Sequence, residues 1–369
     1  MFAGCSAHPL RRPQPTPFLN PELDAPQGRQ EHATRLDLSC ITARRVACMG
    51  LSIDSANFLA KARQSGVRFT ETLTLGRQHM LLKSDHMESV LKAGGAWPPS
   101  QGEAAFRQAV SAEFPWGFPT FARALGAEKV LSMDASAYEG ADLVHDLNQP
   151  VPAEWEERFD VVIDGGTLEH VFNFPAAIAN CMKLVKTGGH LILFTPANNY
   201  FGHGFYQFSP ELFYRVLTPE NGFAVESMIA LADNVGIGSI FGFRYYFPIT
   251  GPWYAVPDPE QIRRRVTLIN HESFILMVLA RKTARRDVLK STPQQSDYTP
   301  RWEKGKGDSA TPRPQDRERT LAWLGRWIAG SYYSSLGRRL TWLINPLRLK
   351  KFRRKNSFHN RALFKRVQD

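Results

Sequence analysis

Acidic residues end three short apolar runs of the chain, at points where a strand would stop and a ligand could be held. Asp134 closes KVLSMD, Asp146 closes ADLVHD and Asp164 closes FDVVID. A carboxylate at the end of a parallel strand can accept hydrogen bonds from ribose hydroxyls. Asp134 also suits a helix cap or a turn, so its local sequence leaves both interpretations open. The segment HDLNQP (145–150) could meet an adenine with Asp146 and Leu147, and it could equally form a turn.

Two histidines follow apolar runs closely and could accept or donate a proton. His170 follows the turn Asp164-Gly165-Gly166, and Gly202 and Gly204 flank His203. An imidazole can act as a general base near neutral pH, whereas the alternative for His170 is a structural role that orients the loop.

Polar and aromatic groups crowd around His203 in NNYFGHGFYQF (198–208). We expect His203 or His170 to remove a proton from a substrate hydroxyl, and Tyr206 to help place that substrate. The ten histidines show no ligand spacing with Cys or Asp, so the sequence predicts no metal site.

Apolar strands that alternate with helices must position these residues. This alternation predicts an α/β fold with a doubly wound, mostly parallel, seven-stranded sheet, in which ligands bind beyond the carboxyl ends of the strands. The predicted strands are 69–76, 129–136, 141–147, 159–166, 190–196, 222–231 and 272–282. The predicted helices are 54–64 with Asp54 as its cap, 119–127, 173–189 and 209–217.

The run FDVVIDGGTLEHVFN (159–173) and the AAIANCMKLVKTGGHLILFTPANN that follows it resemble a known pattern. It is the fourth strand, helix and fifth strand of class I (Rossmann-like) S-adenosylmethionine-dependent methyltransferases of the small-molecule subgroup. The resemblance is good over 129–231 and loose over 65–80 and 272–282. It implies S-adenosylmethionine as cofactor, with Asp134 on the ribose, Asp146 and Leu147 at the adenine, and Asp164 with Gly165 beside the methionine.

The chain departs from this family at the first motif, an acidic residue followed by Gly-x-Gly. The matching segment TLTLGRQ (72–78) has Gly76 alone, followed by Arg77. Either Arg77 contacts the cofactor's carboxylate or the pocket is impaired, which would make the chain a non-catalytic scaffold. A GxGxxG motif is absent, so a nicotinamide dehydrogenase is disfavoured. The expected activity is methyl transfer, most simply to oxygen, on a small-molecule or saccharide-type acceptor.

Composition divides the 369 residues into one domain, which the resemblance implies to be methyltransferase-like, and two extensions. We expect a disordered head (1–48), a domain (49–282) with an insertion at 83–117 and a substrate cover at 232–271, and a linker (283–318). The basic tail (319–369) follows. Residues from 283 onward carry a net charge of +14, against −3 for the rest.

An aromatic amphipathic stretch and a basic cluster in the tail favour either an anionic membrane surface or docking on the protein itself; nucleic acid is a weaker alternative. The sequence has no run of about 18 apolar residues, so we expect no transmembrane helix. We therefore expect a cytoplasmic protein, or one peripheral at the inner membrane surface.

Overall fold

The computed structural model describes residues 50–80, 82–114, 116–233, 250–262, 272–298 and 365–367. Contacts divide the chain into a unit Met1–Ala47 and a unit Cys48–Asp369, and every described residue belongs to the second. The head and most of the basic tail lie outside the described residues. In the part that is described, no helix has the length and apolar character needed to cross a membrane.

A sheet of nine strands runs through this unit in the order β3-β2-β1-β4-β5-β8-β6-β7-β9. The first five strands are parallel to one another, and each of the remaining strands is antiparallel to the neighbour before it. The parallel strands are β1 Glu71–Leu75, β2 Lys129–Asp134, β3 Leu143–Val144, β4 Phe159–Asp164 and β5 Val185–Asn198. The others are β6 Phe223–Asp233, β7 Trp253–Ala255, β8 Ser273–Lys282 and β9 Lys365–Arg366.

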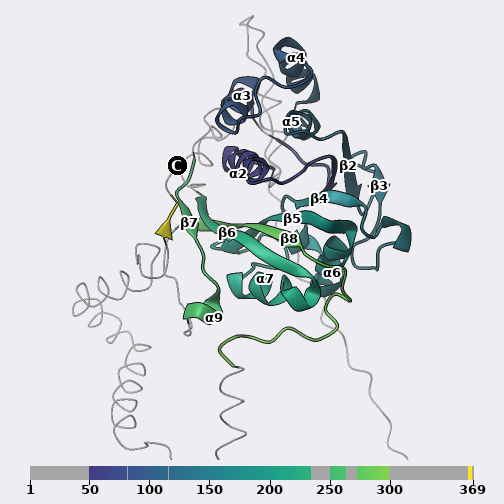
Figure 1. Cartoon of the computed structure of the whole chain (residues 1–369), viewed down its shortest axis with the longest axis vertical. Coiled ribbons are helices and arrows are strands. Elements are labelled where there is room, and N and C mark those ends of the chain that lie inside the picture. Colours follow the sequence, from purple (N-terminus) through teal and green to yellow (C-terminus); the bar gives the residue numbers. More distant parts are fainter. Residues whose placement is uncertain are drawn as a thin grey trace, which may run out of the picture. The chain divides into compact units, whose positions relative to one another are not determined.

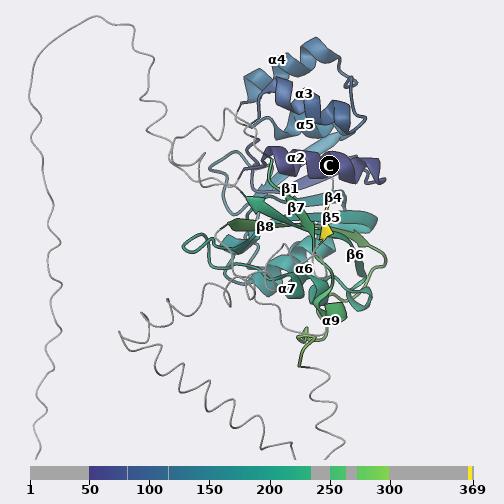
Figure 2. The same cartoon turned by 90° about the vertical axis from the view of Figure 1, so that its left-hand side faces the viewer.

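Helices cover both faces of this sheet, as the alternating pattern predicted (Figures 1 and 2). One side carries α2 Ile53–Gln64, α3 Ser84–Ala93, α4 Glu103–Glu113 and α5 Phe118–Ala124. The other side carries α6 Phe174–Leu184, α7 Pro210–Val216 and α9 Pro259–Ile262. The α/β doubly wound fold is thus confirmed, and the sheet has nine strands where seven were expected, because β7 and β9 extend its antiparallel edge.

One hydrophobic core lies between the sheet and each of its two helical layers. Successive residues of a strand point to opposite faces, so β4 places Val162 in the core beneath α6, and Val161 and Ile163 in the core beneath α2. A strand buried on both faces needs an unbroken apolar run. This requirement explains why the sequence FDVVID shows no polar alternation.

Several element boundaries differ from the sequence prediction. Ser52, not Asp54, caps α2, because its Oγ accepts a hydrogen bond from the Ser55 amide. The helix predicted over 173–189 ends at Leu184, and Gly188 falls within β5. The strand predicted over 141–147 is only the two residues of β3, so Asp146 lies beyond its end.

The predicted insertion, substrate cover and basic tail contain helices or strands where the structure describes them. The insertion 83–117 contains α3 and α4, whose apolar residues join the core. Most of the predicted substrate cover lies outside the described residues, and its segment β7 belongs to the sheet. The end of the basic tail supplies β9, which pairs with β7, and the Val367 amide donates to the Trp253 carbonyl at 2.9 Å.

Candidate functional site

The site predicted from the sequence lies where the strand order reverses. In the order β3-β2-β1-β4-β5, β1 and β4 lie side by side. The chain adds β2 and β3 outward from β1 on one side, and β5 outward from β4 on the other. Folds of this kind bind ligands at such a switch point. Leu75 at the end of β1 is level with Met133 and with Asp164. The structure therefore brings Gly76, Asp134 and Asp164 to one edge of the sheet.

Gly76 turns the chain at this edge with a positive φ of 70°, and its amide donates to the Met133 carbonyl at 2.6 Å. A β-carbon at this position would lie 3.3 Å from Thr167 Oγ1 and 4.0 Å from Asp134 Oδ2. Glycine suits this position because its backbone conformation is unfavourable for other residues and a side chain would crowd the ribose-binding candidate.

Asp134 is not a helix cap, since a turn and not a helix follows β2. Its Oδ1 accepts a long hydrogen bond of 3.4 Å from the Ser136 amide. The carboxylate is partly exposed and lies beside the Gly76 turn, so it is placed to accept hydrogen bonds from a ligand.

Asp164 is fully buried at the end of β4. Its Oδ1 accepts hydrogen bonds from the amides of Thr167 at 2.8 Å and Leu168 at 3.3 Å, and its Oδ2 has no hydrogen-bond partner. Burial raises the pKa of this carboxyl to about 7. The group therefore shapes the turn that follows β4, and its place beside the methionine end stays a prediction.

Gln78 also lies at this edge, and the sequence prediction did not assign it to the site. Its side chain is buried, and its Nε2 donates to the Leu75 carbonyl at 2.5 Å. A β-carbon on Gly165 would clash with Gln78 Oε1, so the amide fills the space directly above Gly165. The departure from the Gly-x-Gly pattern was the available signal, since a long side chain there must occupy space that glycine leaves open.

Arg77 turns away from this amide toward the neighbouring loop. Its guanidinium donates to the Glu139 carbonyl at 2.9 Å and lies 5.0 Å from the centre of the Trp116 ring. A contact between Arg77 and a cofactor carboxylate stays a prediction. In this structure the side chain holds the loop after β2 against the insertion that follows β1.

The predicted adenine-binding residues lie beyond β3. Asp146 Oδ1 accepts hydrogen bonds from the amide and the side chain of Asn148, and these bonds lower the pKa of Asp146. Leu147 is buried in the core. The turn interpretation of 145–150 is thus what the structure contains, and the adenine contact stays a prediction.

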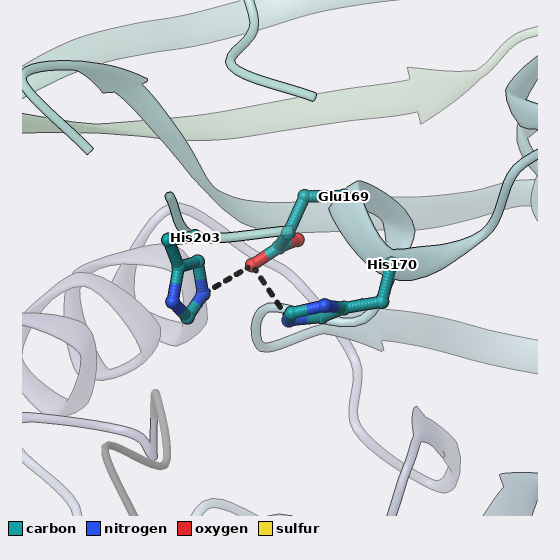
Figure 3. A group of neighbouring side chains, drawn as sticks. All are labelled: Glu169, His170 and His203. Carbon is teal, nitrogen blue, oxygen red and sulfur yellow. Dashed lines mark ion pairs between the residues drawn. The ribbon is translucent and has the colours of Figure 1, made fainter. Parts of the chain in front are cut away.

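The second half of the site joins Glu169, His170 and His203, which are drawn in Figure 3. Glu169 and His170 belong to a 3₁₀ turn, Leu168–His170, which precedes α6. Glu169 Oε1 lies 3.4 Å from His203 Nε2 and 3.9 Å from His170 Nε2. The two imidazole centres are 5.0 Å apart. The side chain of Glu169 points between the two rings (Figure 3).

Backbone contacts fix the loop of His203 against this turn. The amides of Phe205 and Tyr206 donate to the Glu169 carbonyl at 2.7 and 3.3 Å. A β-carbon on Gly204 would lie 2.8 Å from that carbonyl oxygen, so glycine permits the close approach. Tyr206 donates its hydroxyl to the Phe172 carbonyl at 2.6 Å, so this phenol holds the loop in addition to any contact with substrate.

Burial dominates the electrostatics of this cluster. It raises the pKa of Glu169 to about 8, with a further contribution from the Asp164 carboxyl. It lowers the pKa of His203, and it lowers that of His170 together with repulsion from His203. Three phenylalanines beside the cluster are exposed to solvent: Phe172, Phe201 and Phe205.

Comparisons with known proteins give remote structural likenesses. No family model and no curated protein sequence matches the chain. A branched-chain polyamine synthase from Thermus thermophilus is 15% identical over 65% of this chain and 59% of its own, with a TM-score of 0.33. A 1,6-didemethyltoxoflavin-N1-methyltransferase from Burkholderia thailandensis is 14% identical over 67% of this chain and 83% of its own, with a TM-score of 0.31.

At these scores the likenesses carry no argument about activity, and the fold is established by the chain's own strand order. Parallel strands in the order 3-2-1-4-5, with helices on both faces, define a Rossmann-like α/β protein. This is the fold that the resemblance to class I methyltransferases implied.

Proposed function

We propose that this chain is an S-adenosylmethionine-dependent methyltransferase that acts on a small-molecule acceptor. The observation that carries the proposal is the meeting of Gly76 and Asp134 at the switch point of the sheet. The positive-φ glycine lets the backbone turn tightly beside a partly exposed carboxylate, which is the arrangement a bound nucleoside requires.

The residues at this edge fit the nucleoside end of the cofactor. Asp134 would accept hydrogen bonds from the ribose hydroxyls, and the turn of Asp146 and Leu147 would border the adenine. Gly76 and Arg77, with the turn of Asp164 and Gly165, would border the methionine end, where the Gln78 amide offers hydrogen bonds. When bound, S-adenosylmethionine supplies an electrophilic methyl group on its sulfonium.

The acceptor would lie over Glu169, His170 and His203, next to the exposed rings of Phe172 and Phe205. Those rings offer apolar area to an organic acceptor, and the imidazoles offer groups that bind a hydroxyl or its proton. Tyr206 is close enough along the loop to help place it. We therefore propose oxygen as the methylated atom, with methyl transfer promoted chiefly by positioning.

Calorimetry with S-adenosylmethionine on the full chain tests the cofactor site. We expect binding that Asp134→Ala weakens about 10- to 100-fold, because a hydrogen bond to a charged group is worth about 1.5–3 kcal/mol. Asp85→Ala is the matched control, since Asp85 is an exposed aspartate on α3. Equal affinity in the wild-type protein and Asp134→Ala would place the cofactor elsewhere.

A non-catalytic, methyltransferase-like scaffold is the second candidate, and the Gln78 amide above Gly165 favours it. Its expected result is a folded protein that binds no S-adenosylmethionine in the same titration. In that case Gln78→Gly should create space at Gly165, and binding recovered by this variant would identify the amide as the obstruction.

A further inference from the structure

The structure assigns a divalent transition-metal site to Glu169, His170 and His203. One oxygen or nitrogen from each of the three side chains lies within 4.8 Å of the others. Two imidazoles and one carboxylate are a donor set that Zn²⁺ and similar ions accept, with further positions left open. Mg²⁺ and Ca²⁺ prefer oxygen ligands, so the imidazoles favour a transition metal.

The strongest observation for this site is the state of Glu169. Its side chain is fully buried, and neither carboxylate oxygen has a hydrogen-bond partner. Burying an ionised carboxylate without hydrogen bonds is costly, so such a group either takes up a proton or is paired with a cation. A bound metal ion between the rings would compensate it.

The distances fit a metal ion with little adjustment. Zn–N and Zn–O bonds of about 2.0–2.2 Å place ligand atoms roughly 3 to 3.5 Å apart. The 3.4 Å between Glu169 Oε1 and His203 Nε2 already has this spacing, although the pair does not form a hydrogen bond. His170 Nε2 is 3.9 Å away, and its half-exposed side chain has room to approach.

The backbone around the cluster holds it ready for binding. The Glu169 carbonyl accepts two amides from the His203 loop, and Tyr206 ties the same loop to Phe172. Three ligands on two segments locked together lose little freedom when a metal binds. The sequence did not reveal this site, because His203 is distant from Glu169 and His170 along the chain.

The exposed residues Phe172 and Phe205 lie two positions after His170 and His203 in the chain, at the place proposed for the acceptor. An acceptor hydroxyl could bind there as a metal ligand, and binding to a cation favours its deprotonated form. This extension rests on the proposed function. In it His170 and His203 hold the metal, and the proton of the hydroxyl leaves to solvent water.

Zn²⁺ calorimetry and Co²⁺ visible absorption on the full chain, first stripped with a chelator, test the site. We expect the wild-type protein to bind one equivalent of metal per chain. We expect this binding to be lost, or its affinity to fall at least about tenfold, in Glu169→Gln, His170→Ala and His203→Ala. His86→Ala is the control, because His86 is a histidine on α3 outside the cluster. Circular dichroism checks that each variant is folded. Glu169→Gln keeps the side chain's shape and removes only its charge.

Absence of binding by the folded wild-type protein would overturn the site. So would binding that is unchanged in all three variants, since the metal would then be held by other residues. The S-adenosylmethionine titration is measured separately without metal. Metal binding without cofactor binding refutes the proposed function alone, and cofactor binding without metal binding refutes this site alone.

Discussion

Asp164 shows at the scale of one residue how the fold changes a carboxyl group. Burial raises its pKa to about 7, whereas an unfolded chain gives an aspartate about 4. Between these values the folded protein binds the proton more strongly than the unfolded chain does. The contribution of Asp164 to the free energy of unfolding therefore falls as the pH rises from about 4 to about 7.

Asp164→Asn should remove this contribution, because an amide oxygen can still accept from Thr167 and Leu168 but does not titrate. We expect the stability of the variant relative to wild type to increase with pH over that window. Urea unfolding at several pH values measures it, and Asp85→Asn, on an exposed residue, is the control. Parallel pH profiles for wild type and Asp164→Asn would contradict the assignment.

Lys282 acts at the scale of an element, because its buried ammonium satisfies the end of α6. Its Nζ donates to the carbonyls of Met182 at 3.0 Å and Val185 at 2.8 Å, and it pairs with Glu157 at 2.6 Å. The last carbonyls of a helix lack partners within the helix, and a cation compensates them. This contact from β8 helps to end α6 before Gly188, where the local sequence predicted a longer helix.

Lys282→Met should lower the free energy of unfolding by about 3–5 kcal/mol, because it leaves Glu157 and the helix end without their cation. Lys183→Met is the control: Lys183 pairs with Glu156 at 3.4 Å, is 38% exposed and should cost at most about 1 kcal/mol. Urea unfolding followed by circular dichroism compares them. Equal losses in both variants would show that the buried position of Lys282 is unimportant.

Asp54 and Trp253 connect distant parts of the whole molecule. Asp54 on α2 is buried and accepts hydrogen bonds from Trp253 Nε1 at 2.7 Å and from the Gly251 amide at 3.2 Å. Together they fasten the helical layer over β1 to the antiparallel edge of the sheet. The sequence predicted that Asp54 caps a helix, but its partners Gly251 and Trp253 are distant from it in the sequence.

Asp54→Ala should destabilise the protein by about 2–3 kcal/mol, because the indole N–H and the amide lose a buried acceptor. Combining it with Trp253→Phe isolates the shared hydrogen bond. We expect the double variant to lose less than the sum of the two single losses. Strict additivity in urea unfolding would mean that the pair contributes nothing jointly.

The end of the chain also joins the molecule at this edge. Lys365–Arg366 of the basic tail form β9 and pair with β7, whereas docking of the amphipathic stretch on the domain stays a prediction. The membrane surface stays a prediction, since the amphipathic and basic segments lie outside the described residues.

Local patterns were sufficient to predict the parallel part of the sheet and the carboxylates at its edge. A continuous apolar run predicts strands such as β4, and Asp134 and Asp164 mark the ends of their strands in the sequence alone. The same patterns predicted that helices cover both faces. These features depend on neighbouring residues and on burial, which composition and periodicity reflect.

Contacts between residues distant in the chain were decided only by the tertiary structure. Neither the Gln78 amide above Gly165 nor the indole that binds Asp54 has a periodic signature. The grouping of Glu169, His170 and His203 is likewise absent from any short motif, because a turn after β4 and a loop after β5 supply it. Local patterns predicted that β2 ends at Asp134 and β4 at Asp164, but how the loops beyond the strands pack depends on the whole sheet.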